Sequence, residues 1–549
     1  MMYQKSSMSS YMKILLLFVI VMSLGAIYKI WPVYIFENLL SPSRKTMDIN
    51  EMLFAVPVDT KLSSTTRLLN KDVSAAEEEQ LNEALAWPAP EEPLSFENST
   101  DPRTCSCFIK NLNKTYFVGD TLEVILVARD QLGNPKRYGG DFFQAKIHSP
   151  EQKASTYGTV VDHKNGSYTA KFILLWSGNA QVSIRLIHSS EAVAVIRKLR
   201  ESDPHKVFFY GYFEHGKKSE KTVCNILETK ENCCCAYVDP ITQDTWYCGR
   251  PPTLTCDKLK SHSMGGYKAK LSKSDENFLR ATVTNIEVPE SKIQIHITQK
   301  SITLDLKKCT PGMKVPVPAG FYLQDHWTSF VCSTKTFSQV SQVTSCLRKK
   351  NIYMMGDSTL RQWFEYLVQF VPSIKRLDMQ TSDKSGPFLA VDSENNIVMR
   401  WRAHGVPIRT SKTIFADLHY ISNEIRNLGG GPNVVIVFNL CAHFTTLPVH
   451  TYIQRVSRIR NSIVELLQRS PETTVIIKTA NTGYKDVYGS DWLTLQLDTV
   501  LRKMFEGIAV VIIDVWQMTS CHYSGENIHP GKTVIQNEVD MFLSFLCPA

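Results

Sequence analysis

The last third of the chain alternates short apolar runs with longer amphipathic segments. Apolar runs that predict buried strands cover residues 352–355, 434–438, 474–477 and 509–513. Apolar residues at helical spacing predict helices at about 359–371, 451–469, 491–506 and 533–546. Strands that alternate with helices in this way favour a parallel sheet covered on both faces, so we expect an α/β domain over residues 346–549.

A different pattern, with shorter strands and more turns, occupies residues 105–200. Residues 121–128 alternate between apolar and polar side chains, as a half-buried strand does. Residues 160–175 contain two such runs joined by Asn165-Gly166, a dipeptide typical of a tight hairpin turn. Short strands at this spacing predict an immunoglobulin-like β-sandwich. No cluster of catalytic side chains accompanies them, so we expect a spacer or a recognition module.

Residues 1–36 carry a membrane-targeting pattern. Basic residues precede the apolar run 14–28, and a second apolar run follows at 30–36. This charge asymmetry places the rest of the chain in the lumen. We favour an uncleaved type II signal-anchor over a cleaved signal peptide, because apolar residues continue past a cleavage point near Ser23 or Gly25.

Residues 37–104 have the pattern of a stem or linker. Ser74 and Glu77 form a capping-box pattern ahead of a short acidic helix that ends near Trp87. The proline-rich stretch 88–93 then ends that helix and stiffens the approach to the first folded domain.

The cysteines and sequons indicate the secretory pathway. All 14 cysteines lie at or beyond Cys105, which points to disulfides in an oxidising compartment. Residues 201–345 are cysteine-rich, and we expect an irregular, disulfide-bonded region there rather than a metal site built from clustered thiols. The predicted glycosylation sites are Asn98, Asn113 and Asn165.

The overall charge changes this picture little. The chain has 61 basic and 53 acidic residues, a formal net charge of +8, and no basic stripe. We therefore expect no nucleic-acid partner. An anionic glycan or a small acidic substrate fits the composition loosely.

Ser358 is the candidate nucleophile. It follows a predicted buried strand and the dipeptide Gly356-Asp357, and it stands where the next helix begins. Free N–H groups and the helix dipole favour negative charge at such a position, which suits an oxyanion. The alternative is that Ser358 is only the helix N-cap.

His529 is the candidate general base. It lies after the strand 509–513 and just before the last helix, so its loop can return over the strand ends. Its competitors are His404, His443 and His522. A Ser–His pair at the edge of a parallel sheet indicates acyl transfer or acyl hydrolysis.

Two carboxylates compete for the role of orienting the imidazole. Glu526 lies three residues before His529, and Asp514 follows the last predicted strand. Either acid would fix the tautomer and stabilise the imidazolium.

Two further residues are candidate oxyanion donors. Asn439 follows the strand 434–438 and can offer a side-chain amide, and Gly405 can offer a backbone N–H where a side chain would block approach. Ser358, Asn439 and Asp514 each follow a strand. The carboxyl ends of parallel strands meet at one edge, so we expect one shared site there.

These residues resemble known families. In chain order, Gly356-Asp357-Ser358, Gly405, Asn439 and His529 resemble the four blocks of the SGNH/GDSL hydrolases. Residues 137–142 (RYGGDF), 354–363 (MMGDSTLRQW) and 434–439 (VVIVFN) look closer to the neurexophilin and PC-esterase domain family, the NXPE family. Residues 118–122 (VGDTL) and 161–168 (VDHKNGSY) look like filamin-type immunoglobulin repeats.

The resemblance implies an SGNH-like three-layer α/β/α domain and acyl-ester chemistry on glycans. It implies that Ser358 is the nucleophile, His529 the base, and Gly405 and Asn439 the oxyanion donors. Such domains usually carry an aspartate three residues before the histidine. Glu526 stands there in this sequence, which keeps the identity of the acid open.

Our first hypothesis is therefore an O-acyltransferase, with acetyl as the favoured group, in the Golgi membrane or secreted. It would act on glycoprotein glycans such as sialic acid through a Ser–His acyl-enzyme. The acyl donor would be a molecule such as acetyl-CoA, and we expect no bound cofactor. One alternative is an O-acetyl esterase with the same residues. Another is an inactive binding protein whose neurexophilin-like half engages a protein partner, with the membrane contacted through the N-terminal segment.

Overall fold

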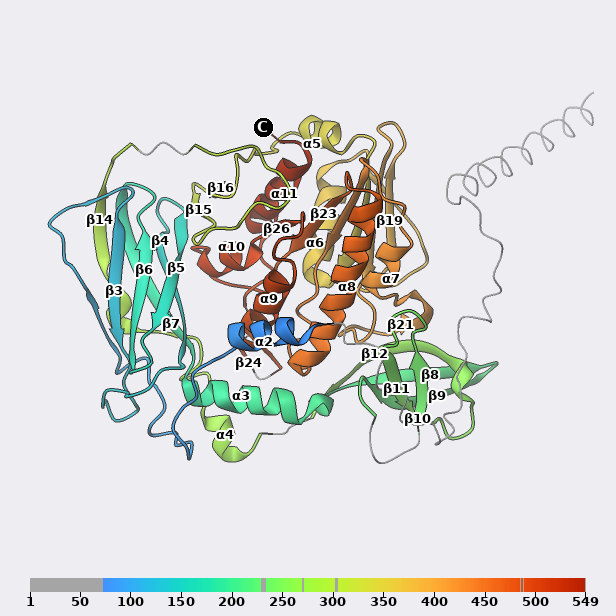
Figure 1. Ribbon diagram of the computed structural model, residues 1–549, viewed down its shortest axis with the longest axis horizontal. Helices are drawn as coiled ribbons and strands as arrows, with labels where there is room; N and C mark the ends of the chain where they lie inside the picture. Colours follow the sequence, from blue (N-terminus) through green and yellow to red (C-terminus); the bar gives the residue numbers. More distant parts are fainter. Residues whose placement is uncertain are drawn as a thin grey trace, which may run out of the picture. The chain divides into compact units, whose positions relative to one another are not determined.

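The computed structural model describes residues 73–228, 234–268, 271–301, 305–483, 485–486 and 488–548 (Figure 1). The predicted membrane anchor and the stem up to residue 72 lie outside the described residues. Among the helices that are described, none is both long and apolar enough to span a membrane.

The last part of the predicted stem is a helix, α2 (Ala75–Ala84). The predicted capping box is present, since the Glu77 backbone N–H donates to Ser74 Oγ at 3.2 Å and the Ser74 N–H donates to Glu77 Oε2 at 2.9 Å. Leu81 is only 1% exposed, and Glu77 forms an ion pair with Arg460 at 2.6 Å. The helix is therefore packed on the folded body rather than acting as a free linker.

The first sheet is antiparallel apart from one short parallel pair. Its strands run in the order β1-β3-β6-β5-β4-β7-β14-β2, with β13, β15 and β16 attached. The bounds are β1 Ser106–Ile109, β2 Tyr116–Phe117, β3 Thr121–Val127, β4 Phe142–Ser149, β5 Ala154–Asp162, β6 Ser167–Ile173, β7 Gly178–His188, β13 Ile286–Glu287, β14 Gln294–Thr298, β15 Gly320–Leu323 and β16 His326–Ser329. The prediction of a β-rich N-terminal region is confirmed.

Two arms of this sheet meet at β5 and enclose one core. Val124 of β3, Ile147 of β4 and Val182 of β7 are fully buried in the same cluster. The predicted hairpin joins β5 to β6, and Gly166 has a φ of +82°, a conformation that glycine adopts without strain.

Residues 201–345 are more regular than we expected. Helix α3 (Ser190–Ser202) leads into a second, antiparallel sheet with the order β10-β11-β9-β8-β12-β21. Its strands are β8 Val207–His215, β9 Lys218–Asn225, β10 Cys234–Val238, β11 Thr245–Gly249, β12 Leu259–Tyr267 and β21 Thr413–Ile414. The same segment contains α4 (Lys273–Asn277) and α5 (Val340–Leu347), and it supplies β13 to β16 of the first sheet. Some of these strands pair with distant segments, as β12 does with β21 and β15 with β5, so local patterning did not reveal the sheets.

Four disulfides join Cys224 to Cys248, Cys235 to Cys256, Cys309 to Cys332 and Cys346 to Cys547. The prediction of disulfides is confirmed for these eight cysteines. Within the described chain, Cys105, Cys107, Cys441 and Cys521 are free thiols. Three of them are buried, where a thiol packs as a small apolar side chain.

The third sheet is largely parallel and has the strand order β18-β19-β20-β17-β22-β23-β26. Its strands are β17 Asn351–Gly356, β18 Lys375–Leu377, β19 Phe388–Asp392, β20 Ile397–Ala403, β22 Val434–Phe438, β23 Thr474–Lys478 and β26 Val511–Ile513. The four predicted strands are present, while β18 to β20 were not predicted. Strand β17 is flanked by β20 on one side and β22 on the other, so the strand order reverses at its carboxyl end.

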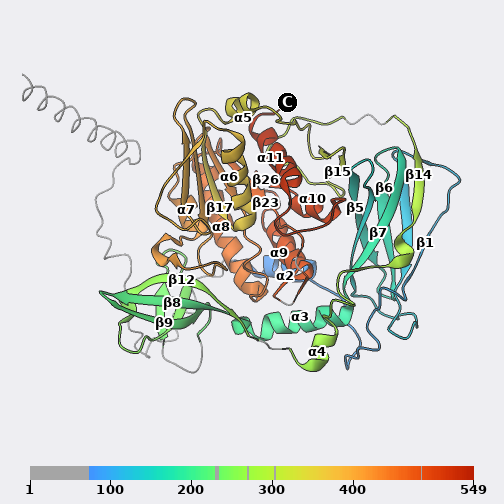
Figure 2. The ribbon, with the colours of Figure 1, turned by 180° about the vertical axis from the view of Figure 1, so that it is seen from behind.

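Helices cover both faces of this parallel sheet (Figures 1 and 2). The four predicted helices are α6 Ser358–Phe370, α8 Val449–Arg469, α9 Asp491–Met504 and α11 Lys532–Leu546, and α7 Ile421–Arg426 and α10 Val515–Cys521 are additional. Neighbouring strand residues point to opposite faces: Met354 packs with α6 and α11, and Met355 packs with α8 and α9. The residues buried on both faces of the sheet are apolar, which explains why the strand segments of the sequence are apolar without interruption.

Candidate active site

The structure brings Ser358 and His529 together. Ser358 is the first residue of α6, and its Oγ lies 2.8 Å from His529 Nε2. The serine is half-buried and the histidine is exposed, so the pair faces solvent. The serine also stands at the switch point of the sheet, where open α/β sheets place their ligands.

Asp357 rather than Ser358 is the N-cap of α6. Its Oδ1 accepts the Thr359 N–H at 2.8 Å, and its backbone adopts an extended conformation. The alternative that Ser358 is only the cap is therefore wrong. The serine hydroxyl is left for contact with His529.

The turn that carries Ser358 is held by Asn439. The Asn439 Oδ1 accepts the Asp357 N–H at 2.9 Å, and its Nδ2 donates to Asp357 Oδ1 at 2.8 Å and to Thr359 Oγ1 at 2.9 Å. A Cβ at Gly356 would overlap the Asn439 amide, so only glycine allows this approach. In this arrangement both amide N–H groups of Asn439 are engaged beside the serine, and its predicted role as an oxyanion donor stays a prediction.

The Asp357 carboxylate is ionised despite its burial. Burial by itself raises the pKa of Asp357, but the charge of His443, the hydrogen bond from Asn439 and the charge of Lys478 outweigh that effect. The net result is a pKa well below the usual range of an aspartate. Asp357, which precedes the nucleophile in the chain, therefore carries a negative charge.

Gly405 lies at the same edge of the sheet. Strand β20 pairs with β17 so that Ala403 is level with Gly356, and Gly405 follows two residues later. Its φ is +85°, and a Cβ there would lie 2.8 Å from the Tyr420 ring. The position therefore requires glycine, as expected for a backbone donor, although its role as a donor stays a prediction.

Neither candidate acid contacts His529. Among the described residues, the recorded hydrogen bonds of His529 go to Ser358 Oγ and, from its backbone N–H, to Asn527 Oδ1 at 2.9 Å. Asp514 is N-cap of α10 and forms an ion pair with Arg502 at 3.0 Å. The structure thus places the base beside the nucleophile and directs Asp514 elsewhere.

The His529 ring has a lowered pKa. Partial burial is the main cause, and the nearby charge of Arg361 adds to it, while Asp357 acts in the opposite direction. A lowered pKa keeps the imidazole neutral at neutral pH. Neutral imidazole is the form that can accept the proton of Ser358.

The competing histidines are engaged elsewhere. His404 Nε2 lies 2.9 Å from His443 Nδ1, and His404 is buried while His443 is half-buried. His522 Nδ1 lies 2.7 Å from Ser524 Oγ. Ser358 therefore has His529 as its imidazole partner in this structure.

A buried lysine that the sequence did not reveal lies close to the Ser–His pair. Lys478 ends β23 and is 0% exposed, and its Nζ donates to Thr359 Oγ1 at 3.2 Å and to Asn481 Oδ1. Asn481 Nδ2 in turn donates to Ile528 O at 2.9 Å. Burial lowers the pKa of Lys478, while Glu538 and Asp357 oppose that shift. A lysine at the end of an apolar strand was the signal that could have revealed it.

Lys478 links the two halves of the site. It contacts the first turn of α6, which carries Ser358, and through Asn481 it contacts the backbone just before His529. Among the described residues, no group of three or more His, Cys, Asp or Glu side chains is arranged to hold a metal ion.

The three predicted glycan acceptors, Asn98, Asn113 and Asn165, have exposed side chains.

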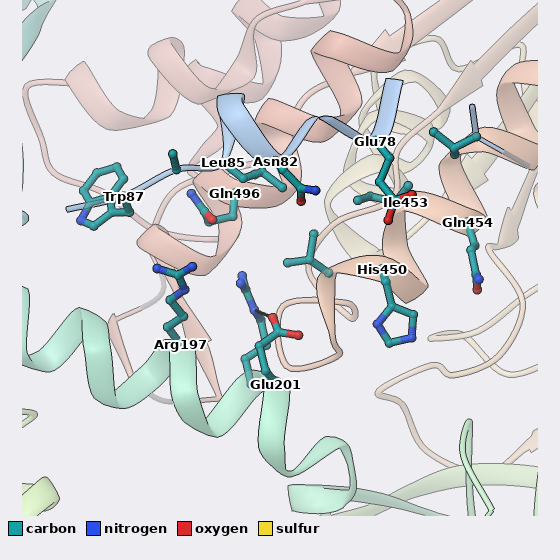
Figure 3. A pocket seen from close by; sticks show the side chains of 14 residues that line it. Glu78, Asn82, Leu85, Trp87, Arg197, Glu201, His450, Ile453, Gln454 and Gln496 are labelled. Atoms are coloured by element: carbon teal, nitrogen blue, oxygen red, sulfur yellow. Dashed lines mark hydrogen bonds and ion pairs between the residues drawn. The ribbon is translucent and has the colours of Figure 1, made fainter. Parts of the chain in front are cut away.

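A cavity of about 700 Å³ lies between α2, α3 and the beginning of α8 (Figure 3). Trp87, Arg197, His450 and Gln496 are among its lining residues, and Glu201 of α3 pairs with the adjacent Arg200 at 2.6 Å. The Ser–His pair is not part of its wall. The cavity is therefore separate from the candidate reaction centre.

Two family models match this chain. The neurexophilin model matches residues 104–278, and the model of the C-terminal domain of NXPE family member 4-like proteins matches residues 327–547. The second match contains Ser358, Gly405, Asn439 and His529.

Matches to solved structures are much weaker. The Escherichia coli adhesin FdeC shares 10% identity over 36% of this chain and 65% of its own, with a TM-score of 0.13. Invasin, a bacterial integrin-binding protein, shares 8% identity over 56% of this chain and 60% of its own, and the Yersinia pseudotuberculosis adhesin InvE shares 10% over 56% and 95%, each with a TM-score of 0.13. The matches to FdeC and invasin thus span less than two thirds of those proteins, and scores this low carry no argument about fold or function.

Proposed function

The chain belongs to the NXPE family, and from that premise we propose that it is a serine-dependent O-acyltransferase, with acetyl as the favoured group. Its acceptors are glycoprotein glycans such as sialic acid. One observation carries the proposal: the 2.8 Å contact between Ser358 Oγ and His529 Nε2 at the N-terminus of α6. A nucleophile and its base within hydrogen-bond reach are the minimum that acyl-enzyme chemistry requires.

The reaction proceeds in two transfers. His529 Nε2 takes the proton of Ser358 as Oγ forms a bond to the acyl carbon of a donor such as acetyl-CoA. The bond to the donor's sulfur then breaks, and the imidazolium returns the proton to the departing thiolate. A sugar hydroxyl next loses its proton to His529 as it attacks the acyl carbon of the acyl-serine. The bond between that carbon and Ser358 Oγ then breaks, and the imidazolium returns the proton to Oγ, which yields the glycan ester and the free serine.

The negative charge that develops in each step lies beside the first turn of α6. The Ser358 N–H and the Gly405 N–H are the donors that we assign to the oxyanion. Asn439 joins them if its amide exchanges one of its present hydrogen bonds, to Asp357 or Thr359, for the oxyanion. Of the two candidate acids, Asp514 is engaged by Arg502 and by the first turn of α10, so Glu526 is the remaining candidate in this proposal.

The proposal includes a finer assignment of the two folds. The first sheet is an immunoglobulin-like, filamin-type sandwich, and the C-terminal domain is an SGNH-like α/β/α unit. Disulfides and exposed sequons support residence in the secretory pathway. Within it, we propose a Golgi type II membrane location, with secretion as the alternative.

A second function competes with this one. Both N–H groups of Asn439 are engaged and neither acid contacts His529, which favours a resting or inactive centre. The chain would then be a binding protein that engages a partner through its neurexophilin domain. A glycan esterase uses the same serine and histidine with water as the acceptor.

The test is the O-acetyl content of cell-surface glycans. Cells would express the wild type, Ser358→Ala or the control Ser274→Ala, which changes an exposed serine of α4. Released sialic acids and neutral sugars would be profiled by mass spectrometry. A serine-dependent gain of acetyl esters supports the transferase, and a serine-dependent loss supports the esterase. No change, with all three chains displayed equally, supports the binding protein.

A further inference from the structure

The first domain presents a polar face to the C-terminal domain. Along β4, Phe143, Ala145 and Ile147 enter the core of the sandwich. The alternate residues Gln144 and Lys146 point to the opposite face and are 6% and 9% exposed. Buried polar side chains on a central strand need partners, and here the partners come from the C-terminal domain.

Lys146 holds the end of the helix that precedes the His529 loop. Its Nζ donates to His522 O at 2.7 Å, and His522 is the C-cap of α10. Burial lowers the pKa of Lys146, and Glu526 is the nearby charge that most favours its protonated form. Lys146 thus bonds the first residue of the segment 522–531 and lies in the field of a carboxylate further along it.

Gln144 reaches the same segment by a second route. Its Nε2 donates to Asp491 Oδ2 at 3.3 Å, and Asp491 Oδ1 accepts the Gly483 N–H at 2.9 Å. Gly483 packs against the loop so closely that a Cβ there would lie 2.5 Å from Ile528 N. His529 is the next residue, so this path ends one peptide from the candidate base.

A third contact strengthens the junction. His188 Nε2, at the end of β7, lies 2.7 Å from Ser490 Oγ, and Ser490 is the N-cap of α9. The first domain therefore bonds both segments that border the His529 loop, at 483–491 and at 522.

We propose that Lys146 and Gln144 are positioning residues of the active site: the neurexophilin domain holds the loop 522–531 so that His529 meets Ser358. The first domain then contributes to catalysis and is not a spacer. This inference rests on the proposed function for its effect on catalysis, while its effect on the loop is independent of that function.

The physical reason is the small tolerance of acyl transfer to displacement. A shift of about 1 Å in a catalytic group can cost on the order of 100-fold in rate. The loop that carries His529 joins α10 to α11, and its described hydrogen bonds include those from Asn481 Nδ2 to Ile528 O and from Gln362 Nε2 to Pro530 O. Loss of the Lys146 ammonium would leave the His522 carbonyl buried without this donor, and the loop would relax.

The experiment uses the purified full chain and two readouts. The first is the rate at which a fluorophosphonate probe labels Ser358, measured from pH 5 to pH 9. The second is hydrogen–deuterium exchange of the amides in residues 522–531. The variants are Lys146→Met, Gln144→Leu, and the control Lys171→Met, which removes an exposed lysine of the same domain that pairs with Glu123.

We expect Lys146→Met to slow labelling by about 10- to 100-fold and to speed exchange of the loop, with no change in Lys171→Met. Gln144→Leu should act in the same direction with a smaller effect, and it serves as the test if Lys146→Met does not fold. In a His529→Ala background, Lys146→Met should cause no further slowing, because the group that it positions is gone.

The outcomes separate the two proposals. Unchanged loop exchange in both variants overturns the positioning role, as does equal slowing by Lys146→Met with and without His529. If the wild type is not labelled but Lys146→Met still speeds loop exchange, the proposed acyl chemistry fails while the hold on the loop stands.

Discussion

Two strand-to-helix junctions of the parallel sheet are built alike and differ in their chemistry. At one, β17 leads to Asp357, whose carboxylate caps α6, and at the other, β26 leads to Asp514, whose carboxylate caps α10. The residue after Asp357 is a half-buried serine beside an imidazole, whereas the residue after Asp514 is the fully buried Val515.

The two carboxylates also differ in the groups that bind them. Asp357 accepts hydrogen bonds from neutral N–H and O–H groups, including those of Thr359 and Asn439. Asp514 is paired with the guanidinium of Arg502, which also binds Asp498 at 2.6 Å. A capping acid after a buried strand is therefore not by itself a sign of catalysis. Whether such a junction is catalytic depends on the residue that follows the acid and on the group that faces that residue.

The largest expected effect comes from removal of the nucleophile, which lies at the junction between β17 and α6. Ser358→Ala should lower acyl transfer and fluorophosphonate labelling by at least about 10³-fold, because no other oxygen occupies that position. Turnover of the variant, compared with wild type and Ser274→Ala, measures this. Retained activity in Ser358→Ala would show that the active site is not at this junction.

The second effect concerns the base. His529→Ala should lower labelling by about 10²- to 10³-fold, because the serine loses its proton acceptor. Burial lowers the pKa of His529, so the wild-type rate should rise with pH through a midpoint below the ordinary histidine value of about 6.5 and then level off. His215→Gln, which changes an exposed histidine at the end of β8, is the control, and a midpoint above pH 7 would contradict the assignment.

Replacing each capping acid tests the comparison directly. Asp357→Asn should slow labelling by about 10-fold, because the turn before Ser358 loses a charge-assisted hydrogen-bond acceptor. Asp514→Asn should change it by less than about 3-fold, since the described partners of Asp514 are Gln517 and Arg502, which lie outside the Ser–His pair. Labelling rates of both variants at equal folded fraction provide the measurement, and equal slowing would mean that the junctions are not functionally distinct.

The same pair should differ in the pH dependence of stability. The folded-state pKa of Asp357 is held below its unfolded value, so its contribution is fully present above about pH 4 and is lost as pH falls through the folded pKa. Asp357→Asn should therefore destabilise the chain by about 1–3 kcal/mol at pH 7 and by less near pH 3. Urea unfolding at both pH values checks this, and an equal loss at both would contradict it.

The smallest expected effect concerns the carboxylate nearest to the base in sequence. Glu526→Gln should slow labelling by less than about 3-fold if the geometry seen here is the working one, because the described hydrogen bonds of His529 go to Ser358 and Asn527, while the charge of Glu526 favours the protonated form of Lys146. An acid that orients the imidazole would instead cost about 10⁴-fold when removed. A loss of 100-fold or more would establish Glu526 as the third member of a triad.

Local patterning predicted the strands that are buried on both faces and the helices that pack one side against the sheet. The run at 434–438 is apolar throughout because both faces of β22 are covered, and α6 shows helical spacing because one side packs on the sheet. It failed for β18 to β20 and for the sheet at 207–267. Some of those strands are very short, such as β18 with its three residues, and others complete their sheet with a distant segment, as β12 does with β21.

The sequence by itself determined the order of the chemistry along the chain. It placed Ser358, Asn439 and Asp514 at strand ends, and a parallel sheet brings strand ends to one edge for topological reasons. His529 in the loop before the last helix was predictable for the same reason.

Only the tertiary structure decided how these groups are partnered. It engaged the Asn439 amide with the turn before Ser358, directed Asp514 to Arg502, and placed the buried Lys478 between the serine and the histidine loop. It also brought Lys146, from a domain that is remote in sequence, onto the end of α10. Hydrogen bonds and ion pairs depend on distances of a few tenths of an ångström between residues hundreds of positions apart, and no local pattern encodes such distances.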